Sequence, residues 1–348
     1  MKTSPRLLTQ KWQDGYPPGT TLPINWRYWI VMIVLCHGMR LAAQPGHFFV
    51  PADTFRQDRF WISAGTGTAI YGGMMIALQQ AWYAQAEQTG FHTFNDWGEW
   101  RHMDKMGHIW TTYNESRWLS QGARWTGMSP ASARWTGVGV AMVLQTSIEV
   151  LDAYSAKWGF SWSDIGANTL GAGIYLAQDM LWQEQRLLIK VSNTPSRYPS
   201  TPIVGSQGGI SSLERRAHDL YGREYSAQFL KDYNGMNIWF SLNPSSFCHN
   251  KPSWLPSWLN IAVGVSGEHL YGGYDNQWVE DGEVFSSDPA AFPRLTQFFL
   301  SPDIDLTRIP VRSPFWRTVL HALNFVKIPA PALSVDSKGR WSGHWLYF

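Results

Sequence analysis

The first long apolar run of the chain predicts a membrane helix. Residues 60–86, between Arg59 and Glu87, contain no Asp, Glu, Lys or Arg, and about 20 apolar residues suffice to cross a bilayer. Small residues recur in this run at four-residue spacing: Gly65, Ala69, Gly73, Ala77 and Ala81. Such a face lets another helix approach closely in lipid. We expect a helix over 59–87 that spans a membrane; the alternative is a buried helix of a water-soluble domain, packed through the same face.

Three further helices are predicted at about 105–121, 131–157 and 164–186. The charge-free cores of the last two, 135–148 and 165–178, are too short for full spans and are typical of helices buried in protein or partly inserted. The last helix also carries small residues at four-residue spacing, at Ser163, Ala167 and Gly171.

The pattern of apolar and polar residues changes after residue 186. Proline and glycine mark a linker at 191–212. Alternating segments predict strands at 237–242, 259–267 and 295–306, and residues 315–325 predict one amphipathic helix. The expected fold is mainly α in the N-terminal half, an approximately four-helix membrane-associated bundle over 44–190. A C-terminal α+β region of short antiparallel strands and one helix follows over 213–348.

The N-terminal region, 1–43, predicts export. Arg27 precedes the apolar run 28–35, and the small residues 41–43 supply a cleavage site. The alternatives are an uncleaved membrane anchor or a lipoprotein modified at Cys36, the latter disfavoured because bulky residues precede this cysteine. The expected location is therefore the cell envelope, at the outer membrane or a periplasm-facing membrane.

The amino-acid composition argues against several classes of protein. Lys and Arg total 28 and Asp and Glu 26, so the net charge of +2 gives no case for nucleic-acid binding. The mean hydropathy of −0.25 argues against a protein made mostly of spanning helices, while 21 Trp favour dry protein or lipid contacts. The two cysteines, Cys36 and Cys248, form neither a zinc motif nor a disulfide framework.

Polar residues at helical spacing interrupt the apolar helices in three places. Two residues that lie three or four apart share a helix face, which groups six candidate metal ligands: Asp104 and His108, Glu149 and Asp152, Asp164 and Asn168. Charges in a dry helical interior are costly unless they are paired, protonated or bound to a cation.

Three interpretations remain open for this cluster. It is a structural network, in which Lys105 pairs with a carboxylate, His108 donates to Glu149 and Asp164 caps its helix. Alternatively it binds a divalent metal of unspecified identity, or it is a catalytic acid–base centre.

The ordered set resembles known families over about 104–173. Asp104-Lys105-x-x-His108, Glu149-x-x-Asp152 and Asp164-x-x-x-Asn168-x-x-Gly171 resemble the VanZ-like membrane family, and more closely the YfiM-like family of uncharacterised predicted periplasmic or outer-envelope proteins. The resemblance implies a helical architecture and a shared site, and it implies no reaction.

Two functions follow as hypotheses. The first is a non-enzymatic membrane protein of the cell envelope, a subunit or accessory of an outer-membrane or envelope complex, with membrane lipid and envelope proteins as partners. The alternative is a membrane-bound, metal-dependent hydrolase acting on lipid or cell-wall precursors. The sequence contains no Gly-x-Ser-x-Gly and no His-Glu-x-x-His motif, so we assign no catalytic residue.

Overall fold

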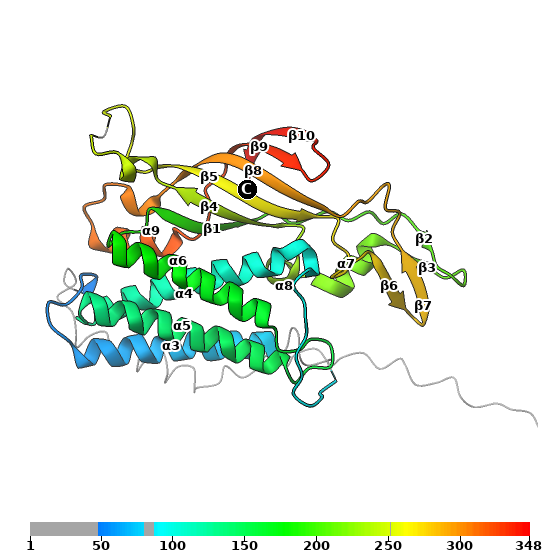
Figure 1. The fold of residues 1–348 in the computed structure, drawn as a ribbon, viewed down its shortest axis with the longest axis horizontal. Helices are drawn as coiled ribbons and strands as arrows, with labels where there is room; N and C mark the ends of the chain where they lie inside the picture. The colour runs from blue at the N-terminus through cyan, green and yellow to red at the C-terminus, as the bar shows by residue number, and fades with distance from the viewer. Residues whose placement is uncertain (1–47, 80–86, 251) are drawn as a thin grey trace, which may run out of the picture. The chain divides into compact units, whose positions relative to one another are not determined.

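The computed structural model describes residues 48–79, 87–250 and 252–348 (Figure 1), and residues 49–348 form one compact unit. The predicted export region, 1–43, lies outside the described residues.

Four long helices make up the first half of this unit. They are α3 (Gln57–Leu78), α4 (Met103–Trp125), α5 (Pro130–Asp152) and α6 (Trp162–Leu181), and a short 3-10 turn, η2 (Glu99–His102), precedes α4. Ser129 and Ser161 cap α5 and α6, since each hydroxyl accepts a hydrogen bond from the backbone N–H three residues later. A helical N-terminal half is confirmed.

The helix α4 lies between α5 and α6 and approaches both at backbone distance. A Cβ atom added at Gly137 on α5 would lie 2.1 Å from Ser120 Oγ, and one added at Gly171 on α6 would lie 2.4 Å from Ile109 O. Only glycine fits at either position. The predicted close packing of the last helix through Gly171 is confirmed, with α4 as its partner.

The helix α3 is attached differently. Two polar contacts attach α3 to its neighbours. Tyr71 hydrogen-bonds Ser147 on α5, and Arg59 donates to Trp125 O at the end of α4 at 3.1 Å. Gly65 and Gly73 are exposed, and a Cβ atom at either position would meet no heavy atom within 4 Å. Among the described residues, the prediction that a helix packs on this small-residue face is therefore wrong.

None of the helices in the described ranges is both long enough and apolar enough to cross a bilayer. The membrane-spanning prediction for 59–87, of which residues 80–86 lie outside the described part of the chain, and with it the membrane-associated bundle, is not supported. The helices α4, α5 and α6 each bury polar residues, among them Asn114, Gln145 and Asn168, which a helix facing lipid on all sides could not do.

The second half is built around a six-stranded antiparallel sheet, in the order β1-β4-β5-β8-β9-β10. Its strands are β1 (Leu187–Asn193), β4 (Met236–Leu242), β5 (Leu259–Glu268), β8 (Leu295–Ile304), β9 (Ala330–Asp336) and β10 (Trp341–Tyr347). Two small hairpins are separate from it: β2 (Ile203–Val204) with β3 (Ile210–Ser211), and β6 (Gln277–Glu280) with β7 (Glu283–Ser286). The remaining elements are α7 (Leu213–Tyr221), α8 (Tyr225–Lys231), η3 (Pro244–Phe247), η4 (Leu306–Arg308) and α9 (Pro314–Leu323).

The predicted antiparallel sheet in the C-terminal half is confirmed, and α9 matches the one helix expected there. The described part of this half also contains α7 and α8. The boundary placed at residue 190 falls inside β1, and the expected linker 191–212 contains the end of β1 and both strands of a hairpin. Apolar alternation did not reveal β1, because Lys190 and Ser192 on its second face are buried polar residues.

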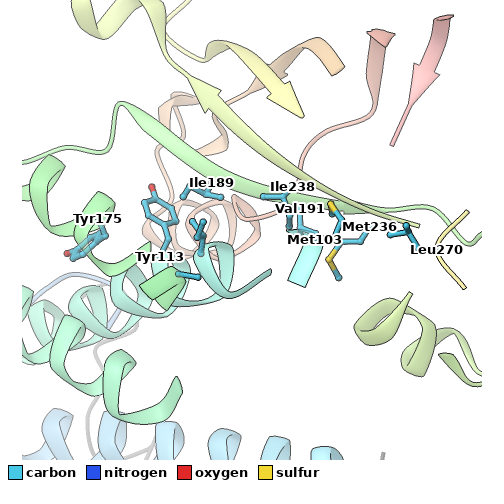
Figure 2. Close-up of a cluster of buried hydrophobic side chains, with 10 residues drawn as sticks. Met103, Tyr113, Tyr175, Ile189, Val191, Met236, Ile238 and Leu270 are labelled. Atoms are coloured by element: carbon cyan, nitrogen blue, oxygen red, sulfur yellow. The ribbon is translucent and has the colours of Figure 1, made fainter. Parts of the chain in front are cut away.

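The two halves share a hydrophobic core. Met103 and Tyr113 of α4 pack with Ile189 of β1 and Ile238 of β4 (Figure 2), and burial of each such side chain contributes about 1.5–3 kcal/mol. A polar contact fixes the same interface, since Asn114 Nδ2 donates to Ile189 O at 3.0 Å. The helices are thus held rigidly against β1 and β4, which places the polar end of α4 described next.

Candidate site at the meeting point of three helices

The predicted polar residues converge where α4 begins, α5 ends and α6 begins. Asp104 and His108 lie in the first turns of α4, Glu149 in the last turn of α5 and Asp164 in the first turn of α6. The loop 153–161 brings the last two together, and Ser161 N donates to Glu149 Oε2 at 3.4 Å. The spacing predicted the shared faces, and the helix packing brings those faces to one place.

The imidazole of His108 is the centre of the site. Its Nε2 lies 3.5 Å from Asp164 Oδ1, 3.8 Å from Glu149 Oε1 and 3.9 Å from Asp104 Oδ1. Its Nδ1 lies 3.1 Å from Asn168 Oδ1 and donates to it, because an amide oxygen only accepts. Thr112 Oγ1 is 2.8 Å from the same amide oxygen. This second contact fixes the orientation of the amide and hence of the ring.

Lys105 bridges three carboxylates on the other side of the site. Its Nζ lies 2.6 Å from Asp164 Oδ1, 2.8 Å from Asp104 Oδ2 and 2.8 Å from Asp96 Oδ2. Asp96 in turn accepts hydrogen bonds from the hydroxyls of Ser161 and Ser163, each at 2.6 Å. The predicted pairing of Lys105 with a carboxylate is confirmed, and it involves three.

The remaining predicted residues occupy the margin of the site. Asn168 contacts His108 and positions the ring. Asp152 lies one turn beyond Glu149 on α5 and is near enough for its charge to raise the pKa of Glu149. In the described part of the chain, the acidic and histidine side chains close enough to hold one metal ion together are Asp104, His108 and Asp164.

Burial and crowding of negative charge shift the proton affinities. Burial raises the pKa of Glu149 to about 8, and burial together with the charge of Asp104 raises that of Asp164 to about 7. Burial would lower the pKa of His108, but Asp104, Asp164 and Glu149 together raise it above its ordinary value. Burial would likewise raise the pKa of Asp104, but His108 and Lys105 lower it. Lys105 and His108 therefore stabilise the ionised form of Asp104, whereas Glu149 and Asp164 favour the protonated form.

The charges around the imidazole do not cancel. Asp96, Asp104, Glu149 and Asp164 bring four potential negative charges, whereas Lys105 and a protonated His108 bring two positive ones. Glu149 is 1% exposed, and its Oε1 accepts no hydrogen bond from any described residue. A buried oxygen in that position is stabilised either by its own protonation or by a cation. The arrangement can therefore hold protons or a metal ion.

Some residues of the site were not predicted from the sequence. Asp96 precedes α4 in an irregular segment, where no helical spacing relates it to the other acids. Tyr233 comes from the second half of the chain, and its hydroxyl donates to Asp104 Oδ1 at 2.8 Å. Asp96 sits eight residues before Asp104, a separation that carries no geometric information in a loop. Tyr233 could be found only from the packing of the sheet against α4.

Comparison with known proteins places this site within a matched region. Residues 93–178, about a quarter of the chain, match a family model described as "predicted periplasmic lipoprotein (DUF2279)". This match supports a resemblance to an uncharacterised family of exported, periplasmic proteins; the VanZ-like resemblance and the outer-membrane location stay predictions. Searches of curated proteins and of solved structures gave no match.

Proposed function

We propose that this protein is a non-enzymatic component of the cell envelope that docks on a membrane through the outer faces of α3, α5 and α6. The observation that carries the proposal is an inverted distribution of polarity in this half of the chain. The ionisable groups of α5 and α6 face other helices, and the residues that these two helices expose to solvent carry no charge.

The exposed faces are apolar as well as uncharged. Ile70 on α3 and Val143 on α5 are each 68% exposed, and Leu170 on α6 is 54% exposed. An open groove of about 670 Å³ between α3 and α5 is lined mainly by aliphatic and methionine side chains. Apolar surface on this scale commonly marks an interaction site.

The dimensions of these faces fit lipid. Helices of 20 to 23 residues are about 30 Å long, so their outer faces offer an elongated apolar surface that can lie along the lipid–water interface. Exposed tryptophans lie near opposite ends, Trp135 at the start of α5 and Trp162 at the start of α6. These two helices are antiparallel, because Arg134 on α5 binds Asp179 at the end of α6 at 2.7 Å. Tryptophan favours the lipid–water interface.

Liposome flotation tests this proposal. We expect the wild-type chain to float with phospholipid vesicles, and a triple variant, Ile70→Asp, Val143→Asp and Leu170→Asp, to lose at least tenfold in vesicle-bound fraction, because each charge would have to enter the hydrocarbon. The control is Trp254→Asp, which changes a residue that is 76% exposed in the C-terminal half and is expected to keep wild-type flotation. Equal flotation of the triple variant and the wild type would overturn the proposal.

The hydrolase alternative rests on a different observation. The side chains of His108 and Asp104 are 17% and 21% exposed, so water reaches the edge of the buried acids. Perturbed carboxyl groups beside an accessible histidine are typical of general acid–base sites. Metal-dependent turnover of a phospholipid or a lipid-linked cell-wall precursor, abolished in Asp104→Asn, would favour the enzyme over the non-enzymatic component.

A further inference from the structure

We propose that the side chains of Asp104, His108, Glu149 and Asp164 form a binding site for one divalent transition-metal ion, with Zn²⁺ as the ion that fits best. The proposal depends only on the geometry of these residues. It does not depend on membrane docking, so either proposal can fail alone.

The histidine is arranged as a metal ligand. Its Nδ1 donates to Asn168, so an ion that displaces the proton from Nε2 finds a lone pair on that atom, and three carboxylate oxygens lie within 3.9 Å of it. A partner that holds the opposite ring nitrogen and orients the imidazole is the usual companion of a metal-bound histidine. Asn168 is therefore assigned as a positioning residue and not as a ligand.

The separations suit a four-coordinate ion. Ligand bonds of about 2.0 Å in a tetrahedral zinc site place neighbouring donor atoms about 3.3 Å apart. Donor atoms of Asp104, His108 and Asp164 already lie within 4.8 Å of one another, so the widest separation would have to close by up to about 1.5 Å. The carboxylate oxygens at 3.5–3.9 Å from His108 Nε2 would each approach that atom by less than about 1 Å. One imidazole with carboxylates favours zinc over Ca²⁺, which takes about six to eight oxygens.

Glu149 gives independent support for a metal-binding site. Its side chain is 99% buried, and Oε1 points toward His108 Nε2 without accepting a hydrogen bond in the described part of the chain. Among the described residues, Lys105 forms ion pairs with Asp96, Asp104 and Asp164 and none with Glu149. A metal ion bound by His108 would supply the positive charge that Glu149 lacks.

Calorimetric titration of Zn²⁺ into the full chain after EDTA treatment tests the site. We expect one Zn²⁺ per chain for the wild type and at least tenfold weaker binding for Glu149→Gln and His108→Gln, because each removes a ligand. The matched control is His102→Gln, which replaces a histidine two residues before Asp104 that belongs to none of the described contacts of the cluster. This control is expected to stay within twofold of wild type.

A second measurement excludes misfolding as the cause. The metal-free Glu149→Gln variant should unfold at the wild-type temperature or above it, because the substitution removes a buried acid from a negatively charged site. Zn²⁺ should then raise the unfolding temperature of the wild type clearly more than that of the variant. No stoichiometric binding by the wild type, or equal binding by all variants, would overturn the assignment and leave a proton-sharing network.

Discussion

Glu115 lies two helical turns after His108 on α4 and continues the line of polar residues into the helical interior. Its Oε2 accepts a hydrogen bond from Gln145 on α5 at 2.9 Å. Burial nevertheless raises the pKa of this carboxyl group to about 7. The native protein therefore favours the protonated acid over a pH range in which the unfolded chain is already ionised.

The buried Glu115 makes the stability of the protein depend on pH. Between pH of about 4.5 and 7 the native state binds more protons than the unfolded state at this position, so stability falls as the pH rises. We expect Glu115→Gln to be more stable than wild type by about 3 kcal/mol at pH 7.5, because the amide avoids the buried charge, and the difference to disappear near pH 4. Urea unfolding of both proteins at the two pH values, with EDTA present, measures it. A difference that does not change with pH would contradict the buried acid.

Individual residues of the site were predictable where they obey helical spacing. Asp104 with His108, and Asp164 with Asn168, share a turn, and their meeting in a dry interior follows from the cost of leaving them unpaired. Asp96 and Tyr233 were not predictable, because a loop and a distant segment bring them in without any periodicity. The role of Asn168 also differs from its sequence assignment, since its amide faces the histidine.

At the scale of elements, small residues have two different roles in this chain. On α5, Ala133, Gly137 and Ala141 are all buried and allow α4 to approach. On α3, the equally regular series that includes Gly65 and Gly73 faces away from the described protein. Four-residue spacing thus predicts a smooth helix face, but the neighbouring elements decide whether another helix covers it.

The close approach of α4 and α6 makes a prediction. Gly171→Ala places a methyl group 2.4 Å from Ile109 O, so α6 must move, and we expect a loss of about 2 kcal/mol in the free energy of unfolding, within the usual cost of overpacking. Because Asn168 lies one turn before Gly171, His108 should also lose its alignment, and zinc affinity should fall.

The control for this prediction lies on the same helix. A Cβ atom at Gly173 meets no heavy atom within 4 Å, so Gly173→Ala should match or slightly exceed wild-type stability, given the helix propensity of alanine. Thermal unfolding and zinc titration of the two variants side by side give the comparison. Equal behaviour would show that the α4–α6 distance is not set by Gly171.

At the scale of the whole molecule, the order of a helical half followed by an antiparallel sheet could be read from the change in periodicity after residue 186. The way the halves join could not. Buried polar residues interrupt the apolar signal of β1, and the sheet contains a fully buried ion pair in which Lys190 Nζ lies 2.8 Å from Asp303 Oδ2. Residues 60–86 resembled a membrane span because they contain no charged residue. In the later helices, charged residues on the inner faces interrupt the apolar sequence, so the apolar outer faces could not be recognised from the sequence.

The central claim is that ionisable groups from three helices meet in the interior of the protein and bind a metal ion there. Anomalous diffraction from crystals of the full chain grown with Zn²⁺, recorded above and below the zinc absorption edge, tests it most directly. We expect one strong anomalous peak about 2 Å from His108 Nε2 and from carboxylate oxygens of Asp104, Glu149 and Asp164. Anomalous peaks confined to surface histidines, with an unchanged His108 environment, would contradict it.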